Sequence, residues 1–153
     1  MPTIILETRI NAPIGKCFDL ARSIDLHMKS MKHTEEQAIA GVTSGLIGLG
    51  ETVTWKARHF GIMMQLTSRI TKCDYPNVFE DKMVYGPFHS FRHTHQFLEN
   101  GNETIMNDEF DYRSPFGWLG KLVDLLFLEA YMRKLLEHRN RVLKQTAESN
   151  SDI

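Results

Sequence analysis

The sequence has few cysteines and no excess of charge of one sign. Cys17 and Cys73 are its two cysteines, too few and too far apart for a disulfide framework or a thiolate zinc site. The 18 Lys and Arg residues nearly balance 19 Asp and Glu residues, for a formal net charge of -1. No overall basic field is therefore present to attract nucleic acid or an anionic membrane. We expect a reduced, cytoplasmic protein without a nucleic-acid partner.

Long apolar runs are also lacking. The opening residues, MPTIILETRINAP, do not have the basic start and apolar core of a signal peptide. Three charged residues interrupt the most apolar window, Trp118 to Met132, so we expect no integral membrane segment. Hydrophobic residues still make up 42% of the chain, which is ordinary for a globular core. Without repeats or linkers, this predicts a single ligand-binding domain over 1–147 and a flexible polar tail over 148–153.

The spacing of apolar residues predicts an α+β fold. A β-branched strand over Thr3 to Ile10 precedes two short helices, near residues 11–21 and 23–30. Six strands are expected next, near residues 34–41, 51–59, 62–73, 78–85, 88–98 and 103–113. Helical periodicity then runs from Trp118 to about Lys144. Strands joined by short turns pair antiparallel, and a curled sheet of this size can hold one long helix on its concave face.

Five stretches in this order carry a likeness to a known family. They are NAPIGKCFDLA, GLIGLGETVTW, FGIMMQLTSRIT, FEDKMVYGPFHSFRHTHQF and SPFGWLGKLVDLLF. With the element order, they resemble the START-like (SRPBCC) superfamily, which includes polyketide cyclases and lipid-transfer proteins, and above all its bacterial ligand-binding SRPBCC branch. The resemblance implies a helix-grip fold, in which a curved antiparallel sheet of about seven strands wraps around a long C-terminal helix. It also implies a cavity for a hydrophobic ligand, but no particular reaction.

The stretch FRHTHQF, residues 91–97, places two histidines and two phenylalanines on one face of a predicted strand. A hairpin turn centred on Asn100-Gly101 would set His93 opposite Asp108 on the following strand. The other expected pairs are Phe91 with Phe110, His95 with Met106, and Phe97 with Thr104. This largely apolar face is predicted to point into the cavity.

Three interpretations of His93, His95 and Asp108 are open. They could bind a metal, but the sequence has no second His or Cys cluster at metal-like spacing, so we expect neither a metal nor a cofactor. His93 held by Asp108 could act as a general base in a cyclase or dehydratase. Alternatively, the three side chains satisfy one another and hydrogen-bond the polar end of a ligand. We favour this last interpretation over catalysis.

The sequence therefore predicts carriage or sensing of a small hydrophobic or amphipathic molecule between the sheet and the C-terminal helix. The predicted ligand-binding residues are apolar or aromatic, with four polar side chains among them: Trp55, Phe79, Asp81, Met83, Phe91, His93, His95, Phe97, Met106, Asp108, Phe110, Tyr112, Leu122, Leu126 and Phe127. A protein–protein adaptor that uses the outer face of the helix and the basic tail region is a further alternative. The sequence does not determine the oligomeric state.

Overall fold

The computed structural model describes residues 2–114, 117–123 and 127–149. Its elements in chain order are β1 (Thr3–Ile10), α1 (Ile14–Ala21), α2 (Ile24–Ser30), the 3₁₀ turn η1 (Lys32–Thr34), β2 (Gln37–Gly41), β3 (Thr52–His59), β4 (Ile62–Asp74), β5 (Val78–Tyr85), β6 (Ser90–Asn100), β7 (Glu103–Arg113), α3 (Gly117–Val123) and α4 (Glu129–Glu148). Within these residues, no helix is both long enough and apolar enough to span a membrane.

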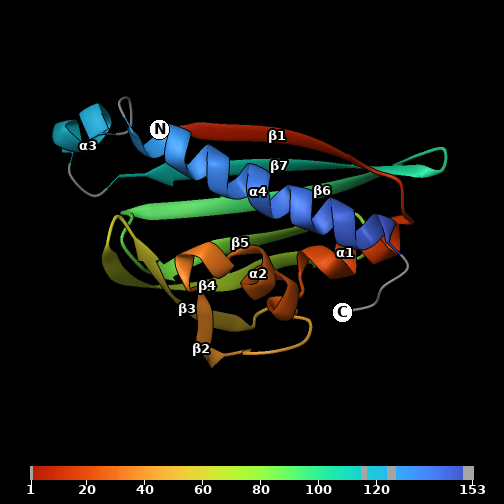
Figure 1. Cartoon of the computed structure of the whole chain (residues 1–153), viewed down its shortest axis with the longest axis horizontal. Helices are drawn as coiled ribbons and strands as arrows, with labels where there is room; N and C mark the ends of the chain where they lie inside the picture. The colour runs from red at the N-terminus through yellow and green to blue at the C-terminus, as the bar shows by residue number, and fades with distance from the viewer. Residues whose placement is uncertain (1, 115–116, 124–126, 150–153) are drawn as a thin grey trace.

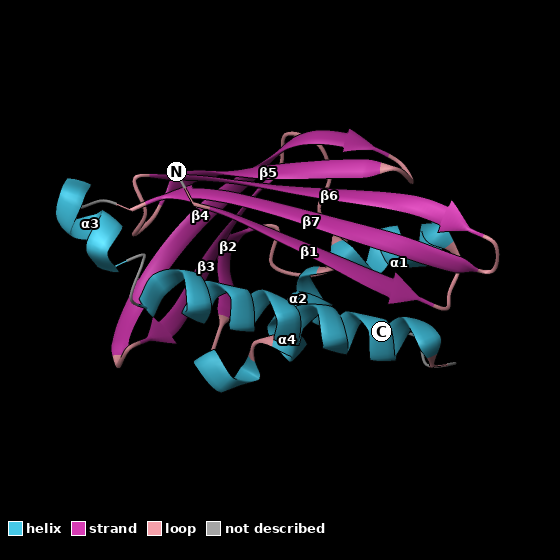
Figure 2. Ribbon diagram, turned by 90° about the horizontal axis from the view of Figure 1, so that it is seen from above, coloured by secondary structure: helices cyan, strands magenta, loops and turns pink. Residues whose placement is uncertain are grey.

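The seven strands form one antiparallel sheet in the order β1-β7-β6-β5-β4-β3-β2. The sheet curves around α4, which lies along one of its faces (Figures 1 and 2). The predicted α+β class, the seven strands and the two short helices after β1 are confirmed. A curved sheet gripping a single long helix is the arrangement that the sequence led us to expect.

The two short helices cover one end of the sheet, where they lie beside the C-terminal half of α4 (Figure 1). The Ser23 hydroxyl caps α2 by accepting a hydrogen bond from the backbone N–H of Leu26 at 3.1 Å. Phe18 projects from α1 into the interior, where its ring contacts the rings of Phe79 and Phe97. These contacts fix α1 against the sheet, because aromatic side chains bury large apolar areas.

The buried apolar residues fall into two groups along α4. The group that we call the packed-end core includes Cys17, Phe18, Phe97, Met106, Leu143 and Ala147. The group that we call the open-end core consists of Ile4, Phe91, Phe110, Tyr112 and Leu136. Between the two groups, α4 turns the polar side chains Arg139 and Asn140 toward the interior, where both are buried. Polar residues therefore mark the middle of an otherwise apolar helix–sheet contact.

The β6–β7 hairpin has a different register from the one predicted. Asn100 pairs with Glu103, so the two-residue loop is Gly101-Asn102, and Gly101 has the positive φ of 64° that glycine tolerates best. As a result, His95 lies opposite Asp108 and His93 lies opposite Phe110. The predicted pairs were wrong by two residues. The predicted faces were right, because a shift of two residues returns each side chain to the same side of the sheet.

The single helix predicted from Trp118 to Lys144 was wrong at its start. The structure has α3 separately, beyond the end of the sheet, and α4 begins at Glu129 (Figure 1). Of the predicted cavity residues here, Leu122 is 48% exposed and Phe127 is 64% exposed, and Leu126 lies outside the described residues. Helical periodicity detects a helix but not the surface on which it packs, and β7 ends at Arg113, before α3 begins.

The end of α4 also extends beyond the prediction. The helix continues through Glu148, and Thr146 and Ala147 are buried. The Glu148 carboxylate accepts a hydrogen bond from the backbone N–H of Asn11 at 2.8 Å and lies 3.1 Å from Lys144 Nζ. These contacts hold the last turn of the helix against the β1–α1 loop. Residues 150–153 of the predicted tail lie outside the described residues.

Candidate functional site

A cavity of about 410 Å³ lies between the sheet and the N-terminal half of α4. Its wall is mainly apolar and includes Trp55, Leu66, Phe91, Phe110, Met132 and Leu136. This size falls within the range of small-molecule sites in proteins, which are typically concave and mostly apolar with a few polar groups. The cavity borders the open-end core, so the same aromatic side chains stabilise the sheet and form the wall.

The structure brings only some of the predicted site residues to this cavity. Trp55, Asp81, Phe91, His93 and Phe110 line it. Phe79 and His95 line a neighbouring pocket of about 80 Å³, which Asp81, His93 and Arg139 also border. The remaining predicted residues lie elsewhere. Phe97, Met106 and Tyr112 are buried in the two cores, and Met83 packs on the open-end core. Asp108 is hydrogen-bonded to His93, and Leu122 and Phe127 are exposed.

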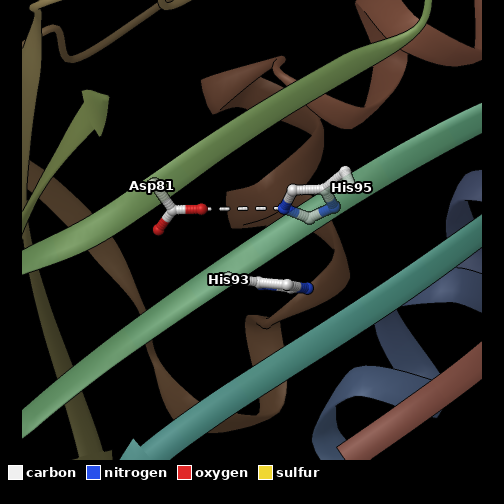
Figure 3. A group of neighbouring side chains, drawn as sticks. All are labelled: Asp81, His93 and His95. Atoms are coloured by element: carbon white, nitrogen blue, oxygen red, sulfur yellow. Dashed lines mark ion pairs between the residues drawn. The ribbon is translucent and has the colours of Figure 1, made fainter. Parts of the chain in front are cut away.

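Four ionisable side chains and one amide meet between the two pockets. We call Asp81, His93, His95, Asp108 and Asn140 the polar cluster. Asp81 lies on β5 directly opposite His93 on β6, and His95 follows two residues later on the same face (Figure 3). Asp108 comes from β7 and Asn140 from α4, so three adjacent strands and the helix contribute.

Asp108 is the centre of this cluster. His93 Nε2–H donates a hydrogen bond to Asp108 Oδ1 at 2.8 Å, and Asn140 Nδ2–H donates to Asp108 Oδ2 at 2.7 Å. His95 Nδ1 lies 3.0 Å from Asp108 Oδ1, although its angle falls outside hydrogen-bond geometry. His93 is only 5% exposed and Asp108 only 1%. The predicted inward contact between His93 and Asp108 is thus confirmed, although the two residues are diagonal rather than opposite.

Burial and neighbouring groups determine the protonation of the pair. Burial lowers the pKa of His93 to about 4, with a further contribution from His95, so its imidazole is neutral at pH 7. Burial raises the pKa of Asp108, but the contacts from His93 and His95 outweigh it and hold that pKa well below its usual value. Because an ionised carboxylate only accepts hydrogen bonds, the neutral His93 carries its proton on Nε2. Its Nδ1 therefore keeps a lone pair.

Asp81 and Asp108 lie near different nitrogens of the His95 ring. Its Oδ1 lies 3.6 Å from His95 Nε2, as the dashed line in Figure 3 marks. Burial raises the pKa of Asp81. The hydrogen bond and charges of the two histidines and the charge of Arg139 lower this pKa by more, so the net shift is downward. The Phe79 ring stacks on the His95 ring with centroids 4.1 Å apart, which fixes the orientation of this imidazole.

Several polar residues of the large cavity were missed in the sequence. Arg139 is buried on α4 and donates a hydrogen bond from its Nη2 to the carbonyl of Ala21 at 2.9 Å. Its position was readable, because Leu135, Leu136, Arg139 and Leu143 follow helical spacing and share the buried face. A guanidinium within an apolar stripe is therefore the sequence signal for this buried cation.

Two further hydrogen-bonded pairs lie in the wall of the cavity. His27 Nε2–H donates to Glu36 Oε1 at 2.7 Å, and the His27 ring stacks on Trp55. His59 Nδ1 and Tyr131 Oη are 2.6 Å apart. All these side chains line the cavity, yet they come from α2, the η1–β2 connection, β3 and α4. No local sequence pattern links segments so far apart.

Comparisons with known proteins identify solved structures that share this fold. A comparison with protein-family models found no match, and neither did a comparison with curated proteins. Among solved structures, TTHA0849 from Thermus thermophilus is 20% identical with a TM-score of 0.80, covering 99% of this chain and 100% of that one. The KanY protein is 13% identical with a TM-score of 0.76, covering 97% and 98%.

Plant proteins also match along their length. The ginseng major latex-like protein 151 from Panax ginseng is 16% identical with a TM-score of 0.67, covering 97% of this chain and 98% of that one. Identities this low establish a shared architecture rather than a shared activity. Together with the seven-stranded sheet around α4, these matches show that the chain has the helix-grip fold.

Proposed function

We propose that the protein binds a small hydrophobic or amphipathic molecule in the cavity between its sheet and α4, as a carrier or a sensor. The observation that carries this proposal is the cavity itself, with its mainly apolar wall and its size of about 410 Å³. Helix-grip structures across the whole chain length support it, since the fold leaves room between sheet and helix. A cytoplasmic location stays a prediction from the sequence.

The polar groups of the wall favour an amphipathic ligand over a wholly apolar one. Asp81, His93 and Arg139 gather at the side where the large cavity meets the smaller pocket. Of the five N–H donors of the Arg139 guanidinium, one is used by the Ala21 carbonyl. A ligand with an acceptor or anionic group could hydrogen-bond the remaining donors while its apolar part contacts Trp55 and Phe91.

Trp55 offers a direct reporter for this proposal. The chain has two tryptophans, and Trp118 is 75% exposed on α3, so Trp118→Phe leaves Trp55 in the cavity wall as the only one. Titration of this variant with 1-anilinonaphthalene-8-sulfonate should quench Trp55 by energy transfer to the probe. We expect saturable binding of one probe molecule per chain.

A matched pair of substitutions tests where the probe binds. Ala57→Phe adds a ring at a buried position of the cavity wall, whereas Ala40→Phe adds the same ring at an exposed position on β2. Ala57→Phe should weaken probe binding at least about tenfold through lost volume, and Ala40→Phe should leave it unchanged. Absence of Trp55 quenching in Trp118→Phe, or equal probe binding by the Ala57→Phe and Ala40→Phe variants, would contradict the proposal.

A second candidate function is catalysis of a cyclase or dehydratase type, with His93 as general base and Asp108 as its partner. The 2.8 Å contact and the place of His93 in the cavity wall favour it. The pKa of about 4 counts against it, because a base that weak abstracts protons poorly at neutral pH. An enzyme of this kind should lose turnover but keep ligand affinity after His93→Ala.

A further inference from the structure

We propose that Asp81, His93 and His95 form a binding site for one divalent transition-metal ion, and that Zn²⁺ fits it well. This inference goes beyond ligand binding, and its test needs no organic ligand. In the described part of the chain, these three residues are the group of His, Cys, Asp and Glu side chains whose potential ligand atoms approach one another closely, all within 4.8 Å. The sequence alone groups the two histidines with Asp108 and predicts no metal there. The structure adds Asp81 as the third ligand.

The backbone presets the three ligands. Asp81 and His93 are directly opposite on β5 and β6, and His95 is the next residue on the same face of β6. The Asp81 Oδ1–His95 Nε2 distance of 3.6 Å is too long for a hydrogen bond. It is close to the roughly 3.4 Å that separates two ligands of a tetrahedral Zn²⁺, given metal–ligand bonds of about 2.0–2.2 Å.

Asp108 supplies the orienting carboxylate that metal-bound histidines commonly have. It accepts the Nε2–H of His93, and its Oδ1 lies 3.0 Å from Nδ1 of His95, so one nitrogen of each ring lies beside Asp108. The other nitrogen, Nδ1 of His93 and Nε2 of His95, is left to bind an ion. Asn140 in turn holds Asp108 through its second oxygen, which extends the support to α4.

The arrangement of acceptors also favours a cation. When the proton of His95 is on Nδ1, the lone pair of its Nε2 faces the carboxylate of Asp81. Two acceptors in contact repel each other unless a proton or a metal ion lies between them. Two carboxylates, Asp81 and Asp108, belong to the cluster, and the permanently charged side chain that acts on Asp81 is Arg139. A dication would compensate the remaining buried negative charge.

The donor set defines the class of ion. Two imidazole nitrogens and one carboxylate oxygen suit Zn²⁺ and other transition metals, whereas Mg²⁺ and Ca²⁺ prefer oxygen ligands throughout. Three protein ligands leave at least one coordination position free. Asp81 and His93 line the large cavity, so a molecule bound there could reach that position.

Isothermal titration of metal-free, untagged protein with ZnCl₂ tests the site directly. We expect one Zn²⁺ per chain with micromolar or tighter affinity, which excess Mg²⁺ and Ca²⁺ do not displace. Co²⁺ in place of Zn²⁺ should give the visible absorption bands of a nitrogen- and oxygen-bound ion. No binding of Zn²⁺ or Co²⁺ to the wild-type protein would overturn the proposal, whatever the protein does with organic ligands.

Variants assign the ligands. Asp81→Asn and His95→Ala should each weaken Zn²⁺ binding more than about 100-fold, and Asp108→Asn by about 10–100-fold, the range typical of groups that orient metal ligands. His138→Ala is the matched control. The His138 ring contacts the His33 ring, with 4.9 Å between the centroids, and His138 is not part of the group of potential metal ligands found among the described residues. It should bind Zn²⁺ as the wild type does.

Folding of the variants needs a separate check. Asp81 has a side chain that is 17% exposed, so Asp81→Asn should keep the fold, which circular dichroism verifies. Zn²⁺ should raise the Tm of the wild-type protein and not that of folded Asp81→Asn. Unchanged affinity in folded Asp81→Asn and His95→Ala would place the ion elsewhere and overturn the assignment.

Discussion

The two halves of α4 lie in very different surroundings. The C-terminal half is covered by α1 and the sheet, and its Leu143 and Ala147 are almost fully buried in the packed-end core. The N-terminal half faces the cavity, where Met132 is only partly buried. One helix thus stabilises the fold at one end and leaves space for a ligand at the other. Stability and binding should therefore depend on different residues.

The largest effect should come from the packed end. Phe18 is fully buried and packs on Tyr75, Phe79 and Phe97, so Phe18→Ala should lower the free energy of unfolding by about 3–5 kcal/mol. Met132→Ala enlarges a space that already exists and should cost less than about 2 kcal/mol. Urea denaturation of both variants measures the difference. Equal losses would mean that the two halves of α4 do not differ as described.

A smaller effect should appear in the pH dependence of stability. Burial raises the pKa of Glu36, but the charge and hydrogen bond of His27 outweigh it, with smaller effects of His59 and Arg139, and the net shift is downward from 4.5. A carboxylate with a lowered folded pKa stabilises the protein above its unfolded value and loses this effect as the pH falls through the folded value. Glu36→Gln should therefore destabilise the protein at pH 7 and lose less stability than the wild type below pH 4.5.

Urea denaturation at a series of pH values measures this slope. Glu99→Gln provides a control, because Glu99 is an exposed carboxylate on β6. Parallel stability curves for the wild type and Glu36→Gln below pH 4.5 would refute the role of the His27–Glu36 pair.

The smallest effects should come from Leu122 on α3 and from Phe127. Leu122 and Phe127 are exposed, so Leu122→Ala and Phe127→Ala should change the free energy of unfolding by less than about 0.5 kcal/mol. Probe binding monitored through Trp55 should stay the same. A clear loss of affinity in either variant would restore the sequence-based prediction that these residues line the cavity.

Much of the fold was predictable because it follows from local periodicity. Alternation in β6 and β7 predicted which side chains share the inner face, and this survived an error of two residues in the register. The His93–Asp108 contact was right for the same reason, since diagonal neighbours on one face remain within reach of an imidazole.

The complete polar cluster was harder to predict. Asp81 meets His93 through the register between β5 and β6, and the residues between these strands, Gly86 to His89, form bends without a short turn motif that would fix the register. Asn140 contacts Asp108 because of how α4 lies on the sheet, which helical spacing alone does not determine. The predicted start of α4 was wrong for a related reason, because the apolar spacing from Trp118 onward is typical of a helix but does not indicate what the helix covers.

The hydrogen bond from Asn140 to Asp108 fixes the position of α4 on the sheet. Apolar contacts have no preferred direction, so a helix held by them alone could slide or roll until its side chains filled the cavity. A displacement of α4 by even part of a turn would pull Asn140 away from a carboxylate with 1% exposure and leave that charge short of a partner. The hydrogen bond from Arg139, the residue before Asn140, to the carbonyl of Ala21 opposes the same movement. The hydrogen bonds of Asn140 and Arg139 therefore hold α4 at a position that keeps the cavity open.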